Sequence, residues 1–138
     1  MTFWILTTEY PPLSGGGIST YCYHTGQMLK EKGHEVTIFI PDYSVAKTQV
    51  LNDNDITVVR FKPDLSHHEY LGEEAALSLS FSEILIEYSA ENQPPDFIEA
   101  QEYNGIAYFA LQKRLLLSDY FKNSVFYVTA HAPGFLYL

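Results

Sequence analysis

Short apolar runs alternate along the chain with longer stretches of helical period. The runs are rich in β-branched and aromatic residues and are apolar at nearly every position, as in strands that are covered on both faces. They predict strands at residues 2–8, 35–40, 56–61, 96–100 and 124–130. Apolar positions that recur at i, i+3, i+4 and i+7 predict helices over residues 18–32, 73–92 and 104–117.

This order of elements predicts the fold class. Strands that alternate with long helices form right-handed βαβ units and a parallel sheet. We therefore expect a Rossmann-like α/β fold with a parallel sheet, helices on both faces and the first strand at the centre. The polar segment 43–55 predicts a loop with a short helix, and residues 62–72 predict a loop.

Size and charge narrow the classes of function. The 138 residues suggest one domain, and 46% apolar against 18% charged residues favour a packed core. Lys and Arg number 8, against 17 Asp and Glu, for a net charge of −9. Such a surface repels phosphate backbones and anionic lipid, so we expect no nucleic-acid partner.

The compartment follows from what the chain lacks. Its one cysteine, Cys22, excludes an internal disulfide and favours a reducing compartment. No apolar run approaches the ~18 residues of a membrane span, and the start has no positive signal-peptide region. We expect a cytoplasmic protein.

The last residues, 135–138, are all apolar, which is unusual for a natural tail. We interpret the chain as the amino-terminal part of a larger protein, or as a chain cut inside an element. Exposed apolar ends favour association, so we expect self-association or packing through this end.

Gly15, Gly16 and Gly17 lie between the first strand and the first helix. Glycines let the backbone approach a ligand closely, and the N-terminus of the helix offers free N–H groups that hold anions. The spacing fits neither the dinucleotide fingerprint nor the P-loop. Contact with a phosphate or another ligand and a flexible tight turn remain alternatives.

Polar residues follow two other strands at the same edge of the sheet. His131 comes directly after the fifth strand and is a candidate catalytic residue, with a structural histidine as the alternative. Glu102 and Asn104 follow the fourth strand and could bind a polar ligand in the same crevice, or cap the third helix.

We expect no metal site. Residues 53–55 have an Asp-x-Asp form but precede a strand in a polar segment, which favours a solvated turn. Residues 67–69 hold adjacent histidines that point in different directions and have no partner pair. Cys22 falls on the apolar stripe of the first helix and is expected in the core.

Residues 7–18 and 29–37 together resemble the start of group 1 (family 4) glycosyltransferases. The sequence Pro-Asp-Phe-Ile-Glu-Ala at 95–100 and Val-Thr-Ala-His at 128–131 resemble later strands of that family. The resemblance spans nearly the whole chain.

The resemblance implies a GT-B architecture in which residues 1–138 are the amino-terminal, acceptor-side domain. The carboxyl-terminal domain, with its Glu-x7-Glu signature and most of the nucleotide-sugar site, is absent from these residues. The implied reaction moves a sugar from a nucleotide-sugar donor to a sugar, lipid or other small acceptor, with retention and without a metal or cofactor. The resemblance leaves open whether the full-length enzyme lies at the periphery of a membrane.

The same resemblance implies roles for the candidate residues. The glycine loop would lie near the donor diphosphate and the acceptor, His131 near the transferred sugar, and Glu102 and Asn104 on the acceptor side. We expect this chain alone to bind nucleotide sugar weakly and to transfer nothing. The alternative is a non-catalytic Rossmann-like or flavodoxin-like module that binds a nucleotide or another ligand.

Overall fold

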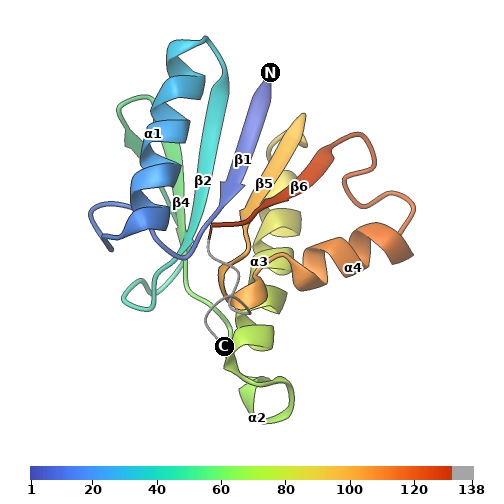
Figure 1. The fold of residues 1–138 in the computed structure, drawn as a ribbon. Coiled ribbons are helices and arrows are strands. Elements are labelled where there is room, and N and C mark those ends of the chain that lie inside the picture. Colours follow the sequence, from blue (N-terminus) through green and yellow to red (C-terminus); the bar gives the residue numbers. More distant parts are fainter. Residues whose placement is uncertain (132–138) are drawn as a thin grey trace.

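Six strands form one sheet in a computed structural model of the protein, which describes residues 1–131 (Figure 1). The strands are β1 (Thr2–Leu6), β2 (Glu35–Pro41), β3 (Gln49–Asp53), β4 (Ile56–Phe61), β5 (Phe97–Gln101) and β6 (Val125–Thr129). Their order is β3-β4-β2-β1-β5-β6, and every neighbouring pair is parallel except β3 and β4. The expected position of the first strand inside the sheet is confirmed.

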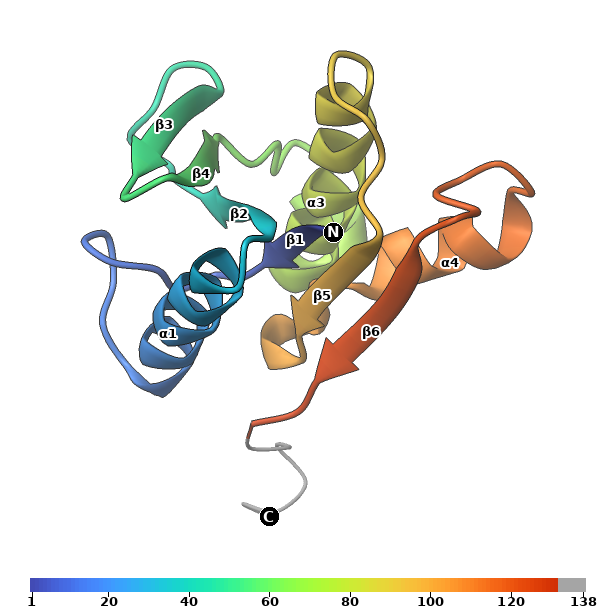
Figure 2. The same ribbon diagram turned by 90° about the horizontal axis from the view of Figure 1, so that it is seen from above.

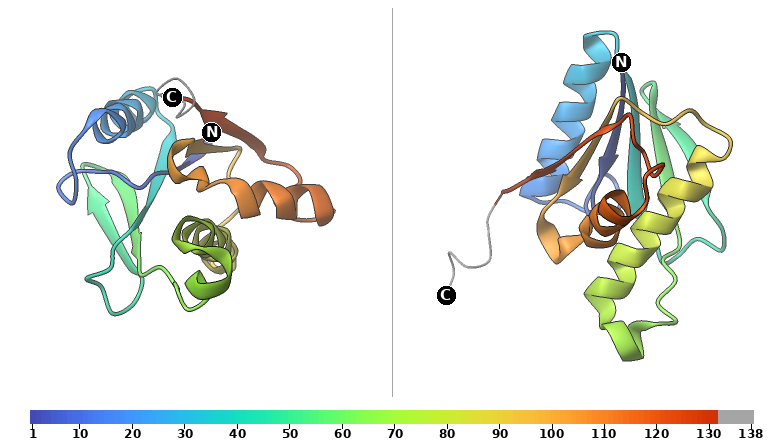
Figure 3. Two further views of the ribbon diagram at one scale, coloured as in Figure 1. Left: turned by 60° about the horizontal axis from the view of Figure 1, so that its bottom comes forward. Right: turned by 90° about the vertical axis from the view of Figure 1, so that its right-hand side faces the viewer.

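Helices cover both faces of this sheet. They are α1 (Gly17–Glu31), α2 (His68–Leu71), α3 (Glu73–Ser89) and α4 (Tyr108–Leu116), with a short 3₁₀ turn, η1, at Tyr103–Gly105. α1 lies on one face, whereas α3 and α4 lie on the other (Figures 2 and 3). The predicted three-layer Rossmann-like α/β fold is confirmed.

Two hydrophobic clusters explain the near-continuous apolar strands. On the α3 and α4 side, Trp4 and Leu6 of β1 pack with Phe39 and Phe81. On the α1 side, Ile5 of the same strand joins a second cluster. Alternate residues of β1 are therefore buried in opposite layers, which is why the strand has no polar face.

Helix α1 packs closely on its face of the sheet. Cys22 lies in the α1 cluster, as expected, and is fully buried. Burial raises the pKa of its thiol to about 11. One turn later, a Cβ at Gly26 would come within 3.2 Å of Ile56 Cδ1, so a glycine at this position lets the helix approach β4.

The prediction for residues 43–55 is wrong. Instead of a loop with a short helix, the segment contains β3, which pairs antiparallel with β4 at the edge of the sheet. Asn54 and Asp55 form the turn between the two strands, both with positive φ. The sheet is therefore mixed rather than all parallel.

One helix prediction and one loop prediction also need correction. The third predicted helix begins at Tyr108 rather than 104, because Asn104 and Gly105 have φ of 57° and 59° and interrupt it. The segment 62–72 contains the short helix α2. The helices within residues 1–131 are too short or too polar to cross a bilayer. Residues 135–138, where we expected self-association, lie outside the described part of the chain.

Candidate active site

The ends of β1 and β5 and the start of α1 lie together at the carboxyl edge of the sheet (Figure 1). A cavity of about 880 Å³ lies at this edge. It is lined by Glu9, Gly16, Gly17, Ile18, Glu74, Glu102, Tyr103, Asn104, Gly105 and His131. The segments that follow β1, β5 and β6 therefore converge here. They bring together the sequence-predicted site residues except Gly15, which does not line this cavity in the described part of the chain.

The glycine loop holds a carboxylate at the N-terminus of α1. Gly16 is the N-cap of the helix and has φ of 136°, which favours glycine. The carboxylate of Glu9 lies beside it: a Cβ on Gly16 would be 2.8 Å from Glu9 Oε2. Negative charge is stabilised at a helix N-terminus. The Glu9 carboxylate therefore lies where the sequence analysis gave contact with a phosphate or another ligand as one alternative.

Hydrogen bonds within the loop fix its path. Thr7 Oγ1 donates to the carbonyl of Glu9 (2.9 Å), and the Glu9 N–H donates back to Thr7 Oγ1 (3.1 Å). The Tyr10 N–H donates to Ser14 Oγ (3.0 Å) and the Ser14 N–H to the Tyr10 carbonyl (3.2 Å). Ser19, inside α1, donates to the Ser14 carbonyl (2.8 Å). The glycine-rich segment is thus tied to the helix that follows it.

The corner after β5 presents Glu102 and Asn104 to the cavity. The Glu102 N–H donates to the carbonyl of Thr129 on β6 (3.1 Å). Buried Ser78 of α3 anchors the far side of the corner, donating to the Ile106 carbonyl at 3.1 Å. The N-cap position of α4 is Ala107, and no side chain caps the helix. The capping alternative for Glu102 and Asn104 is therefore wrong.

His131 is both packed and turned toward the cavity. Its ring meets Tyr21 of α1 edge-on, with ring centroids 4.7 Å apart. Its Nε2 forms a hydrogen bond with Oε1 of Gln101 at the end of β5. The side chain is half-buried and lines the cavity. This placement is compatible with both alternatives for His131, a structural histidine and a catalytic residue.

Behind His131 lies Glu99, a buried carboxylate that the sequence analysis did not single out. It is 1% exposed and accepts hydrogen bonds from the hydroxyls of Tyr21 (2.8 Å), Thr129 (2.7 Å) and Tyr127 (3.0 Å). Burial and then the negative charge of Glu99 raise the pKa of Tyr127. Burial and the hydrogen bond to Glu99 do the same for the pKa of Tyr21. No local motif marks this cluster, since its members come from three elements.

The cavity carries negative charge. Among the described residues that line it, Glu9, Glu74 and Glu102 are carboxylates and none is Lys or Arg. Among residues 1–131, no group of three His, Cys, Asp or Glu side chains is arranged to hold a metal ion. Carboxylates and an imidazole bind hydroxyl groups well, whereas a diphosphate would here meet repulsion.

The Asp-x-Asp segment lies away from the cavity. Asp55 pairs with Lys30 Nζ at 2.7 Å, and Asp53 accepts a 3.4 Å hydrogen bond from Tyr10. Lys30 lies in the last turn of α1, at the opposite end of the helix from Gly17, which lines the cavity. Asn54 and Asp55 form a turn, as expected, whereas Asp53 is the last residue of β3.

The sequence model of the family described as "Glycosyl transferase 4-like domain" matches residues 16–120. An uncharacterized glycosyltransferase of Methanocaldococcus jannaschii is 33% identical over 67 residues, which are 49% of this chain and 16% of that protein.

Solved structures show the same fold. The catalytic domain of starch synthase IV from Arabidopsis thaliana, bound to ADP and acarbose, aligns with a TM-score of 0.72 and 17% identity over 94% of this chain and 33% of that one. Sucrose-phosphate synthase from Thermosynechococcus elongatus aligns with a TM-score of 0.72 and 17% identity over 99% and 34%. The chain thus spans about a third of these relatives' length. Its fold is that of a domain of GT-B glycosyltransferases.

Proposed function

Because this chain belongs to the family of glycosyl transferase 4-like domains, we propose that it is the amino-terminal, acceptor-side domain of an enzyme that transfers a sugar from a nucleotide-sugar donor to an acceptor. The cavity of about 880 Å³ carries this proposal, because it collects Gly16, Gly17, Glu102, Asn104 and His131 at one place. Ligands of open α/β sheets bind at this carboxyl edge.

Each lining group has a proposed task. His131 hydrogen-bonds a hydroxyl of the transferred sugar and stabilises charge that develops during transfer. Glu102 and Asn104 orient the acceptor, since a carboxylate accepts from sugar hydroxyls and an amide both donates and accepts. Gly16 and Gly17 let the substrate approach the backbone without a Cβ in the way.

The donor diphosphate needs positive charge from outside this domain. Within residues 1–131, the cavity lining includes three carboxylates and no Lys or Arg. We therefore assign the diphosphate mainly to a carboxyl-terminal domain that faces this one across a cleft. We further propose that the transfer retains the configuration at the anomeric carbon and needs no metal or cofactor. We also propose that the enzyme is cytoplasmic.

The test is an assay of the full-length protein that contains this chain. Purified protein is incubated with uridine, adenosine and guanosine diphospho-sugars and a panel of sugar and lipid acceptors, and products are identified by mass spectrometry. Release of nucleoside diphosphate together with a glycosylated acceptor supports the proposal. Binding of donor without turnover for any acceptor would instead favour a non-catalytic nucleotide-binding module.

A further inference from the structure

A ladder of polar side chains lies between the cavity and the core. Register pairs Glu99 of β5 with Tyr127 of β6, and Gln101 with Thr129. Alternate residues of a strand face the same side, so these four side chains share the α1 face, and His131 continues the β6 series by two positions. His131, which lines the cavity, is therefore the last member of a row of side chains that begins at the buried carboxylate of Glu99.

The carboxylate fixes how the amide of Gln101 points. Glu99 offers only acceptor atoms, so the NH₂ group of Gln101 faces it: Nε2 donates to Glu99 Oε1 at 3.2 Å. The amide oxygen is then directed the other way, where it meets His131 Nε2. An amide oxygen only accepts, so the imidazole nitrogen in this hydrogen bond carries a proton.

The remaining donors hold Glu99 in place. Tyr21 and Thr129 donate to Oε1, and Tyr127 donates to Oε2. None of the hydrogen-bond partners recorded for Glu99 within residues 1–131 is a Lys or Arg, so hydroxyls and one amide satisfy a buried charge. A buried carboxylate without such partners is costly, and this arrangement leaves it one orientation.

We propose that Glu99, acting through Gln101, is a positioning residue that sets the tautomer and orientation of His131: Nε2 holds the proton and Nδ1 is left for a substrate hydroxyl. Only the identity of that substrate rests on the proposed function. Gln101 is the relay, because it joins a group that accepts on one side to a group that must donate on the other. The edge contact with Tyr21 restrains the ring from the helix side.

The tautomer is read directly by two-bond ¹H–¹⁵N correlation spectra of ¹⁵N-labelled full-length protein at alkaline pH, where imidazoles are neutral. The spectrum of His131→Ala assigns its signal among the histidines. We expect the Nε2–H tautomer in the unmodified protein. In Gln101→Met, which keeps the length of the side chain but not its amide, we expect the Nδ1–H form to appear beside it. An Nδ1–H form in the unmodified protein, or no change in Gln101→Met, overturns the proposal.

Two further variants place the origin of the effect at Glu99. Glu99→Gln removes the acceptor-only partner, so the amide of Gln101 can turn around and we expect the second tautomer here too. Tyr127→Phe is the matched control, because it removes a hydroxyl from the other carboxylate oxygen and leaves the link to Gln101. The control should keep a single tautomer. Equal behaviour of the two variants contradicts the relay.

A second substitution keeps the test independent of whether Gln101→Met folds. Gln101→Leu likewise removes both the donor to Glu99 and the acceptor for Nε2–H, so we expect the Nδ1–H form here too. The carboxylates Glu9, Glu74 and Glu102, which line the same cavity, are unchanged in this comparison. A single Nε2–H tautomer in Gln101→Leu counts against the relay. Absence of sugar transfer in any variant bears on the proposed function and leaves the tautomer result intact.

Discussion

The carboxylate of Glu9 and the α-carbon of Gly16 are so close that a methyl group on Gly16 would lie 2.8 Å from Glu9 Oε2. The two residues come from opposite ends of the glycine-rich loop. Their contact closes the loop over the N-terminus of α1 and places a negative charge there. A side chain at Gly16 would displace the end of the Glu9 side chain and would be strained at φ of 136°.

Gly16→Ala should destabilise the protein, because φ of 136° is strained for alanine and because the new Cβ displaces the Glu9 carboxylate from its place beside the helix N-terminus. We expect a loss of about 1–3 kcal/mol in the free energy of unfolding, measured by urea denaturation. Gly15→Ala is the control, since nothing lies within 4 Å of its added Cβ, and it should change stability by less than ~1 kcal/mol. Equal losses in both variants would contradict this account of the loop.

His131→Ala in the full-length protein should lower kcat/KM by about 10²-fold or more, as expected when a hydrogen bond to the reacting group is lost. The exposed His24 of α1 provides the matched control, and His24→Ala should stay within a few-fold of the unmodified protein. Initial rates at several substrate concentrations measure the effect. A value for His131→Ala within a few-fold of the unmodified protein would rule out the proposed role.

The 138-residue chain alone should bind nucleotide sugars no tighter than roughly millimolar. The reason is electrostatic: in the part of the chain that the structure describes, the cavity is lined by three carboxylates and no Lys or Arg, and one helix N-terminus contributes little. Calorimetric titration with uridine and adenosine diphosphoglucose measures the affinity. Micromolar binding, or turnover, would show that this domain holds a complete donor site.

Asp42, directly after β2, gives a pH-dependent contribution to stability. Hydrogen bonds from Ser44, and then the guanidinium of Arg60, hold the pKa of Asp42 below its usual range. A pKa that is lower in the folded state stabilises the fold above the usual value near ~3.9, and the contribution disappears as pH falls through the folded pKa. Asp42 is buried, at 6% exposed.

Asp42→Asn should therefore lower the free energy of unfolding by about 1–3 kcal/mol at pH 7, and by less at pH 3. Urea denaturation at both pH values measures the difference. Asp119→Asn is the control, because Asp119 is 86% exposed and pairs only with Lys122 among its recorded ion pairs. A difference that does not shrink at low pH would exclude this origin.

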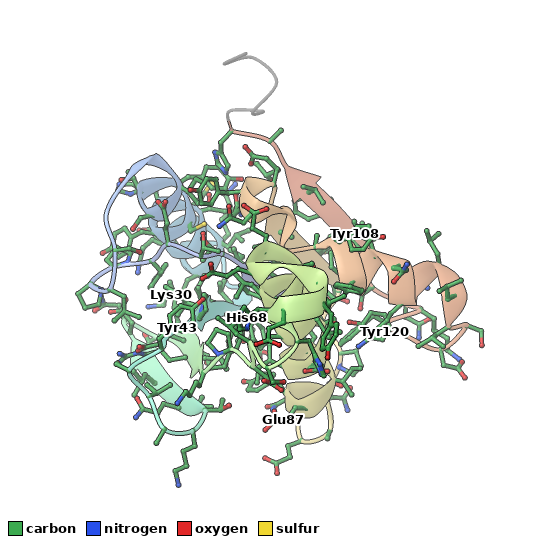
Figure 4. The ribbon with its side chains drawn as sticks, turned by 90° about the horizontal axis from the view of Figure 1, so that it is seen from below. Lys30, Tyr43, His68, Glu87, Tyr108 and Tyr120 are labelled. Carbon is green, nitrogen blue, oxygen red and sulfur yellow. The ribbon has the colours of Figure 1, made fainter. Side chains whose placement is uncertain are left out.

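The sheet edge at β6 and the end of α4 expose apolar side chains. Leu115 and Leu116 are 86% and 75% exposed, and Val125 is 54% exposed. Tyr108, at the start of α4, is exposed as well (Figure 4). We expect the isolated chain to self-associate through this side, with a second copy as the partner. The variant with Leu115→Lys and Leu116→Lys should shift light scattering toward the monomer. A monodisperse monomer of the unmodified chain at high concentration would contradict this.

The central elements were predictable because burial on two faces leaves a strong pattern. β1, β2 and β4 are apolar runs, and α1 has a regular stripe. β3 was missed because its residues are mostly exposed and pack into neither layer, so no hydrophobic pattern remains. The local signal was the turn at Asn54 and Asp55, whose residue types favour positive φ and join two strands. The Asn104-Gly105 pair was a similar signal for the late start of α4.

The site was predictable as far as topology reaches. Parallel strands bring their carboxyl ends together, so the segments with Gly16, Glu102 and His131 had to meet. Glu9 and Glu74 were not singled out, because their place in the cavity depends on how the loop and α3 turn. Glu99 was missed because an acidic residue within a strand is recognisable as a network centre only when its partners on α1 and β6 are known.

The burial of Cys22 makes this domain convenient for site-specific labelling. Its thiol is inaccessible and, with its raised pKa, almost entirely protonated at neutral pH, so alkylating reagents should pass it by. A cysteine introduced at the exposed turn residue Asn54 would then be the one reactive thiol among residues 1–131. A fluorophore there sits on the hairpin, away from the cavity, and can report rigid-body motion of this domain in single-molecule experiments without removal of the native Cys22.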